Sequence, residues 1–476
     1  MTSLVNHRTV DAEEAVVYYD FRVTYIASAF DGVALTSFSS NERPANEALI
    51  EVTLGQQVQQ LSTQEMDGLA GITQCYIPPN ATAVYHFEPD KAGSFWWHSQ
   101  HNTQYPYGLR GPLVEKDIDA EYNVQLADIY HGDPGVPPMW DFILINNRGR
   151  YNCTAAATYS FTKCSEDQPL TRFRFKTGKK HLLRVMSMSA LAPFEFSIDG
   201  HLLRVIAVDG ESLEPSELIT NITINIGQRY DLLVEAKNAT DTPIGSFWIR
   251  ATGLNGLPWT AATGANASDG SISDKELDDQ LADRRRLVPA LRSGLRYVVL
   301  LAVYYCQTVG VGMTTAELPV TSIPREIFYG DHVEIVLVNE QNEQHPFHLH
   351  GHSPWVVGSR HATLADVQSN TLRPLKLSGA MFRDVYTVPV CPVGDTDACT
   401  GVGYVVLRLE ADNPCVWMMH CHIDWHLDDG LAMIFVEGEK QLQQAGVDAF
   451  FSSTFSVCGS YYTGAAFNTA TTVTVP

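Results

Sequence analysis

Residues 420–431 read His420-Cys421-His422-Ile-Asp-Trp-His426-Leu-Asp-Asp-Gly-Leu431. If this run begins as a β-strand, neighbouring side chains point to opposite faces, so Cys421 faces one way and the histidines on either side of it face the other. One strand would then serve a thiolate-bound metal and a second metal centre behind it. Electrons could pass from Cys421 into either flanking histidine through a few covalent bonds.

A second histidine cluster lies about seventy residues earlier, as His345-Pro-Phe-His348-Leu-His350-Gly-His352. His348 and His350 share one face of a strand because they are two residues apart. Pro346 lacks the N–H that a strand ladder needs, so we expect it to set His345 apart from the other two. His345 can then supply a nitrogen ligand to the metal that Cys421 binds.

The thiolate site is expected to comprise His345, Cys421 and His426, the last returning to the cysteine side in the turn after the strand. Two histidines and one cysteine with a weak or absent axial ligand form a blue-copper electron-transfer site. The axial position would fall to Leu431, which cannot coordinate and should therefore stabilise Cu(I). Zinc also takes cysteine and histidine, but so many nearby histidines would be unusual for one tetrahedral zinc ion.

The rest of the chain indicates β-structure. Polar and apolar residues alternate with period two at 221–226 and 333–339, which predicts strands and hence sandwiches. The chain has 476 residues, of which 45% are hydrophobic, so several domains of roughly 100–150 residues with sizeable cores are expected. The expected fold class is all-β.

Several motifs resemble those of the multicopper oxidases, the family of laccases, ascorbate oxidases and ferroxidases. Besides the two histidine clusters they comprise Met66-Asp67-Gly68, Thr73-Gln74-Cys75, Trp96-Trp97-His98-Ser99, Tyr105-Pro-Tyr-Gly-Leu-Arg-Gly111, Gly227-Gln228-Arg229-Tyr230-Asp231, Arg383-Asp384 and Asp412-Asn413-Pro414. The resemblance implies three consecutive cupredoxin-like Greek-key β-sandwich domains. We place the first at 15–118, the second at 119–262, a linker with the start of the third at 263–325, and the third at 326–476.

The resemblance also implies a reaction. Members of this family take electrons singly from a reducing substrate, a phenol or Fe(II), at a type 1 copper and pass them to a trinuclear cluster that reduces O2 to water. His345, Cys421 and His426 match the family's type 1 ligands, and they are the expected catalytic residues. His348 matches a type 2 ligand, and His98, His350, His420 and His422 match type 3 ligands.

The sequence departs from the family pattern at two single positions. Gln100 stands where a cluster ligand is expected, and His101 could replace that ligand only if the backbone slipped by one residue. Tyr107 replaces an acid that lies near the cluster in the family. A splicing error cannot explain such point differences, so a degraded, copper-binding paralogue with a defective trinuclear site stays an alternative.

The first domain also lacks the family's His-x-His-Gly motif. In the second and third domains a Gly-x-x-x turn leads through a strand, a turn and a return strand, but after Gly55 the return strand has no counterpart. A lost exon and a genuinely degraded paralogue are the two explanations, and the abrupt gap favours the first. The first domain is therefore expected to be incomplete.

The nine cysteines suit an oxidising compartment. Cys153 with Cys164 and Cys391 with Cys399 are close enough for local disulfides. The resemblance implies a further bond between Cys75 and Cys458. The pairing of Cys306 and Cys415 stays open.

Composition sets the remaining expectations. A net charge of −22 disfavours nucleic acid and anionic membranes as partners, and no apolar stretch is long enough to span a bilayer. Sequons at Asn80, Asn221, Asn238 and Asn266 suit a secreted monomer, and the acidic charge suits a protein that works in acid, although no signal peptide is visible at the start. The expected function is a laccase-like oxidase. The alternatives are a ferroxidase, an impaired copper-binding paralogue and, least favoured, a zinc hydrolase without an evident general base.

Overall fold

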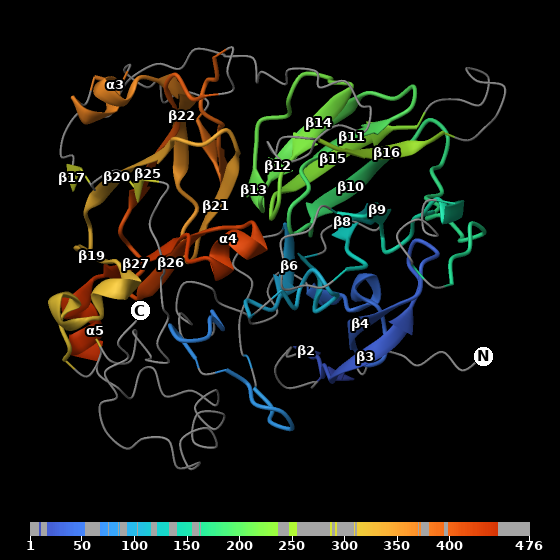
Figure 1. Cartoon of the computed structure of the whole chain (residues 1–476), viewed down its shortest axis with the longest axis horizontal. Helices are drawn as coiled ribbons and strands as arrows, with labels where there is room; N and C mark the ends of the chain where they lie inside the picture. Colours follow the sequence, from blue (N-terminus) through green and yellow to red (C-terminus); the bar gives the residue numbers. More distant parts are fainter. Residues whose placement is uncertain are drawn as a thin grey trace.

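The computed structural model is mostly β-structure, with 44% strand and 10% helix, which confirms the predicted all-β class (Figure 1). It describes residues 9–10, 17–52, 67–74, 76–83, 85, 93–101, 103–115, 121–132, 140–154, 161, 163–236, 247–254, 286–287, 291–292, 309, 312–369, 371–372, 380–394 and 398–445. The segment after Gly55, where the sequence lacks a return strand, lies outside this range.

The N-terminal part contains small sheets. One is a three-stranded sheet in the order β5-β7-β6, and the others are the antiparallel pairs β3-β4 and β1-β2. The strands are β1 (Thr9–Val10), β2 (Val17–Tyr18), β3 (Val23–Ser28), β4 (Leu35–Ser40), β5 (Ile50–Val52), β6 (Ser94–His98) and β7 (Arg110–Glu115). Strand β6 ends at His98, so this sheet presents one expected copper ligand at its edge.

The middle part is built from a six-stranded sheet, in the order β13-β12-β15-β10-β8-β9, and a three-stranded sheet, in the order β14-β11-β16. Its strands are β8 (Glu121–Ile129), β9 (Phe142–Ile145), β10 (Lys180–Ser187), β11 (Phe194–Ile198), β12 (Leu203–Val208), β13 (Glu211–Ser212), β14 (Asn221–Ile224), β15 (Arg229–Glu235) and β16 (Ile249–Gly253). Side chains on β14 alternate between buried and exposed, as the period-two pattern at 221–226 predicted. The pattern at 333–339 also marks a strand, β20 (His332–Asn339), but its residues from Val333 onward are all buried.

The C-terminal part also has two sheets, β17-β20-β25-β22-β23 with β18 beside β20, and β19-β27-β26-β21-β24. Its elements are β17 (Arg286–Leu287), β18 (Leu291–Arg292), β19 (Pro324–Ile327), β20 (His332–Asn339), β21 (His345–Leu349), β22 (Trp355–Ala362), α3 (Leu364–Gln368), β23 (Met381–Phe382), β24 (Val385–Val388), β25 (Val402–Glu410), β26 (Val416–Cys421), α4 (Asp424–Asp428), β27 (Ala432–Glu437) and α5 (Glu439–Ala445). Strand β26 lies inside its sheet, which explains why every residue in it is buried.

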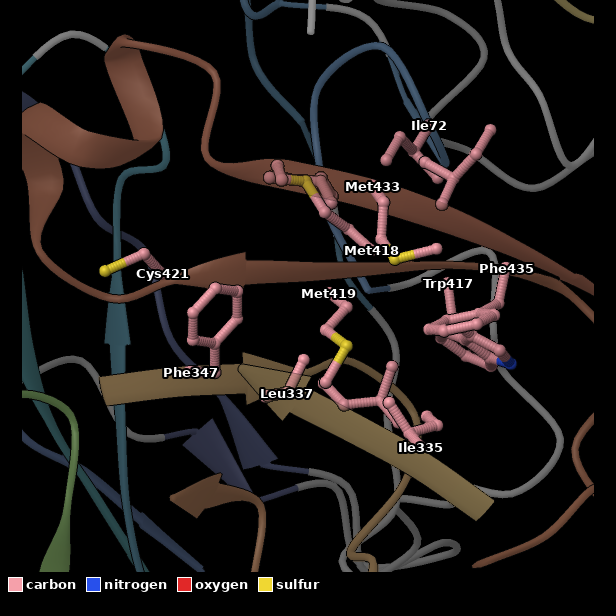
Figure 2. Packing of buried hydrophobic residues seen from close by; sticks show 14 of the residues in the cluster. Ile72, Ile335, Leu337, Phe347, Trp417, Met418, Met419, Cys421, Met433 and Phe435 are labelled. Carbon is pink, nitrogen blue, oxygen red and sulfur yellow. The ribbon is translucent and has the colours of Figure 1, made fainter. Parts of the chain in front are cut away.

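The largest hydrophobic core surrounds β26 (Figure 2). Met418 and Met419 pack there with Leu337 and Phe435, and Phe347 lies opposite Cys421 in the ladder between β21 and β26. Fully burying a large apolar side chain contributes about 1.5–3 kcal/mol. The strand that carries the thiol is therefore held rigidly by its own apolar residues.

The three parts meet where β6 and α4 lie close to the middle of the molecule (Figure 1). A buried ionic network joins the middle part to the C-terminal part: Arg229 contacts both oxygens of Asp384 at 2.7 and 2.8 Å, and Arg383 contacts Asp209 at 2.7 Å. Among the described residues, no helix is long and apolar enough to cross a membrane.

Candidate metal centres

The pairing of β21 with β26 positions the histidine clusters. His348 lies opposite His420, and Phe347 lies opposite Cys421. We expected Pro346 to break the ladder, but β21 runs through it and pairs with β24 from His345 onward. Paired residues with β26 start at Phe347, but the carbonyl of Pro346 accepts from the N–H of His422 at 2.6 Å. The expected break at the proline was therefore wrong.

The first centre brings together the three residues expected at the thiolate site. Cys421 Sγ lies 3.7 Å from Nδ1 of His345 and 3.5 Å from Nδ1 of His426. The three potential ligand atoms lie within 4.8 Å of one another. His426 reaches this position from α4, a single helical turn that follows the strand. The backbone N–H of Cys421 donates to the carbonyl of Leu431, which brings the expected axial residue back beside the thiol.

Burial controls protonation at this centre. It lowers the pKa of His345, with some help from His426, to about 3, and that of His426 to about 4. Both imidazoles are therefore neutral, as metal ligands must be. Burial raises the pKa of the Cys421 thiol, and the charge of Glu343 adds to that increase. A bound metal cation would reverse this effect, since coordination deprotonates a thiol.

The distal nitrogens of the two imidazoles both face the loop between β20 and β21. His345 Nε2 lies 3.0 Å from the side-chain oxygen of Gln341. His426 Nε2 lies 3.5 Å from Oε1 of Glu343. Burial raises the pKa of Glu343 to about 7. The same short loop therefore places an amide beside one histidine and a carboxyl group beside the other.

The second centre is a group of five buried imidazoles behind β26. Ring centroids lie 4.7 to 6.1 Å apart in contacting pairs, and the Nε2 atoms of His350 and His420 are 3.3 Å apart. The members are His98, His348, His350, His420 and His422. Burial is the main cause that lowers the pKa of His98 to about 3 and that of His348 to about 4, and it holds those of His420 and His422 well below the usual value.

Oxygen atoms hold the Nδ1 side of four of these rings. The acceptors are the carbonyls of Ser99, Asp384 and Cys421 for His98, His348 and His420, and Oδ1 of Asp67 for His350, at 2.8 to 3.0 Å. A ring that donates from Nδ1 carries no proton on Nε2. That nitrogen is then free to coordinate a metal, which is the usual arrangement around metal-binding histidines.

Aromatic rings and one glycine form the wall of the five-histidine group. Trp96 stacks on His98 at 4.2 Å and on His422 at 5.4 Å. Tyr105 meets both imidazoles edge-on, and its hydroxyl donates to the carbonyl of His422 at 3.2 Å. Gly227 approaches the same ring from the middle part of the chain. These contacts fix the orientation of the imidazoles.

The positions that depart from the family pattern lie beside this group. His101 packs against Tyr76 at 4.6 Å and acts electrostatically on Asp428, and it is not joined to the five imidazoles by the ring contacts given above. Gln100 is half-buried. The hydroxyl of Tyr107 donates to the carbonyl of Gly132 at 3.2 Å.

Comparisons with known proteins give the family. Three multicopper oxidase domain models match residues 47–119, 94–268 and 305–441. Laccase-2 of Botryotinia fuckeliana is 30% identical over 448 residues, which cover 81% of this chain and 72% of that protein. The chain belongs to the multicopper oxidase family.

This multicopper oxidase is also similar to an iron transport protein and to a laccase of known structure. Iron transport multicopper oxidase fio1 of Schizosaccharomyces pombe is 29% identical over 431 residues, covering 80% of this chain and 66% of that protein. The crystal structure of the laccase from Botrytis aclada matches the fold with a TM-score of 0.72 at 23% identity, over 94% of this chain and 92% of that one. The latter supports the cupredoxin-like fold.

Multicopper oxidases contain copper of types 1, 2 and 3 and use O2 and a reducing substrate. The donor set of this oxidoreductase suits copper, because a thiolate with two imidazoles and a separate all-imidazole group match its preference for sulfur and nitrogen ligands. Among the residues that the structure describes, five imidazoles gather at the second centre, whereas the family resemblance implies eight. No histidine lies between His7 and His86 in the sequence, so the missing His-x-His has no substitute there.

Four residues that contact the candidate metal-ligating histidines were not assigned a role from the sequence. Asp67 and Gly227 lie in motifs that carried the family resemblance, so those motifs were a usable signal. Gln341 and Glu343 precede His345 by four and two residues, and only the path of their loop reveals their contacts.

The structure also contains both predicted local disulfides, Cys153–Cys164 and Cys391–Cys399. Cys415 is disulfide-bonded. Cys75, Cys306 and Cys458 lie outside the described residues, so the predicted Cys75–Cys458 bond stays a prediction.

Proposed function

We propose that this multicopper oxidase is a laccase-type enzyme that oxidises phenolic donors one electron at a time and reduces O2 to water. His345, Cys421 and His426 would hold type 1 copper. His98, His348, His350, His420 and His422 would hold the trinuclear cluster. The observation that carries the proposal is the position of Cys421, with two imidazoles at its thiol and two further cluster histidines as its neighbours in the chain.

When bound, copper supplies the one-electron redox chemistry and the binding of oxygen. The chain's own residues connect the two centres. The peptide groups on either side of Cys421 join its thiol to His420 and to His422, and the carbonyl of Cys421 accepts from Nδ1 of His420 at 2.8 Å. This gives a route of covalent bonds and one hydrogen bond, so electrons need not cross a gap between side chains.

The surrounding residues exclude water and fix the ligands. Trp96 stacks on His98 and His422, Tyr105 meets the same two rings edge-on, and Gly227 contacts His422. Leu431 packs against the core around β26, and its side chain would offer no axial ligand to a copper bound at the thiolate site. An apolar axial residue favours Cu(I) and raises the reduction potential. A high potential is what oxidation of phenols requires.

Copper reconstitution of the full chain tests the proposal. We expect an intense blue absorption band, about four copper ions per chain and oxygen uptake with a phenol such as 2,6-dimethoxyphenol. A blue band with one copper ion and no oxygen uptake would instead show an electron-transfer protein with a defective cluster. Absence of the blue band would overturn the type 1 assignment itself.

Ferroxidase activity is the second candidate, and one observation favours it. The carboxyl group of Glu343 lies beside His426, and a carboxylate is a suitable ligand for Fe(II). A relative whose name is iron transport multicopper oxidase links this family to iron. Oxygen uptake with Fe(II) measured against uptake with the phenol, as kcat/KM for each, decides between the two substrates.

We further propose that the chain acts outside the cell as a monomer, in three domains with the boundaries 15–118, 119–262 and 326–476. The two disulfides support an oxidising compartment. Size-exclusion chromatography with light scattering tests the oligomeric state. Limited proteolysis followed by mass spectrometry tests the boundaries.

A further inference from the structure

The loop between β20 and β21 gives the two type 1 histidines different neighbours, an amide for His345 and a carboxyl group for His426. Each imidazole directs Nδ1 toward Cys421 Sγ. A histidine that coordinates copper through Nδ1 must carry its proton on Nε2, and this N–H is a donor that a nearby acceptor can satisfy. Gln341 accepts from His345, and the group nearest to the corresponding atom of His426 is Glu343.

Glu343 lacks the partner that this N–H would provide. Its Oε1 is buried and has no hydrogen-bond partner among the described residues, although His426 Nε2 is only 3.5 Å away. The side chains of His426 and Glu343 are 16% and 12% exposed. A buried carboxyl oxygen without a donor is costly, and so is a buried N–H without an acceptor. The two atoms complement each other.

The loop holds Glu343 in this place by its backbone. The side-chain amide of Asn339 donates to the carbonyls of Glu343 and Pro389, and its oxygen accepts from the N–H of Gln341. The N–H of Cys391, a disulfide-bonded residue, donates to the carbonyl of Gln341. The backbone at Glu343 is therefore held in place by the rest of the loop.

We propose that Glu343 is a positioning residue that accepts a hydrogen bond from His426 Nε2 and lowers the reduction potential of the type 1 copper. A carboxylate on the far side of a ligating imidazole increases the basicity of that ligand, and the positive charge of a bound metal would favour the ionised form of Glu343, whose negative charge then lies close to the metal. Both effects favour Cu(II) over Cu(I). Glu343 thus opposes Leu431, whose lack of coordination favours Cu(I). The inference depends on the type 1 site proposed above, and on neither the donor nor the cluster.

The test is a redox titration of the blue band in full-length, copper-loaded protein. We expect Glu343→Gln to raise the ratio of Cu(I) to Cu(II) about tenfold at the midpoint potential of the unchanged protein, which corresponds to about 59 mV for one electron. The matched control is Asp429→Asn, which removes the same charge from an exposed position three residues after His426. It should change the ratio less than about twofold, because solvent screens exposed charges.

A converse variant keeps the proposal testable if Glu343→Gln does not load copper. Gln341→Glu places a second carboxylate against Nε2 of His345 and should lower the ratio about tenfold. Equal potentials in Glu343→Gln and the unchanged protein would overturn the proposal. So would an equal shift in the Asp429→Asn control, or no shift in Gln341→Glu. A protein without a blue band, by contrast, would contradict the proposed function.

Discussion

Gly227 and His422 are in direct contact across the junction between the middle and C-terminal parts of the chain. A Cβ atom at position 227 would lie 2.4 Å from Cδ2 of the imidazole, far inside van der Waals contact. The glycine also has a φ of +76°, which other residues rarely adopt. The backbone of the middle part at Gly227 therefore lies in direct contact with the imidazole of His422, a proposed cluster ligand.

We predict that Gly227→Ala displaces His422 and lowers the number of cluster copper ions, while the blue band of the type 1 site survives. Gly330→Ala is the matched control, because Gly330 has a similar φ of +81° but open space where the Cβ would go. Copper counted per chain, together with the type 2 copper signal in electron paramagnetic resonance, provides the measurement. Equal copper loss in both variants would assign the effect to backbone strain alone.

The buried pair of Arg229 and Asp384 should be essential for stability. Arg229→Gln leaves a carboxylate buried without its cation, and such losses cost about 3–5 kcal/mol. The carbonyl of Asp384 also accepts from His348, so cluster copper should fall as well. Arg250→Gln is the control, because the Arg250–Asp199 ion pair is also bidentate but lies in an exposed position.

Urea denaturation of the two variants decides this point. A midpoint that falls only in Arg229→Gln supports the role of the buried pair, since exposed ion pairs contribute little. A comparable fall in Arg250→Gln would show that burial is not the reason.

Cys421→Ser should abolish the blue band, because a hydroxyl is a poor ligand for copper where a thiolate is required. The five-imidazole group does not use this side chain, so about three copper ions should remain. Absorption spectra and a copper count measure both effects. The control replaces Cys153 and Cys164 together by serine, which removes a disulfide distant in sequence and should leave the band intact.

Leu431→Met should lower the type 1 potential by supplying a weak axial sulfur ligand. Leu427→Met makes the same exchange at another partly buried leucine near α4 and should leave the potential unchanged. Spectroelectrochemical titration compares the two. An unchanged potential in Leu431→Met would place this side chain away from the axial position.

Much of the site follows from the sequence because strand geometry is simple. Alternation along β26 dictates that Cys421 and its two neighbours serve different faces, and the spacing of His348 and His350 puts them on one side. The sequence predicted only that His426 lies in the turn after the strand, and it did not predict the short helix α4 that carries this residue. The contact of Glu343 with it depends on how the preceding loop bends, which no periodicity encodes.

The departures near Gln100 show the same limit. Whether His101 could replace the missing ligand depended on a one-residue shift of the backbone. His101 packs against Tyr76, and β6 runs to His98 without a shift in its register with β7. Comparison of the domains with one another predicted the missing return strand, but sequence patterns could not say where neighbouring side chains would lie.

The wall of five imidazoles has a consequence for the assembly of the protein. His98 comes from the N-terminal sheet, and the other four lie in or just after β21 and β26, far along the chain. Metal bound by both groups of histidines would form a reversible cross-link between an early and a late part of the polypeptide. A ligand that binds only the assembled form stabilises it in proportion to the logarithm of its concentration. Copper supply would then govern how long the chain survives proteases as well as how fast it turns over.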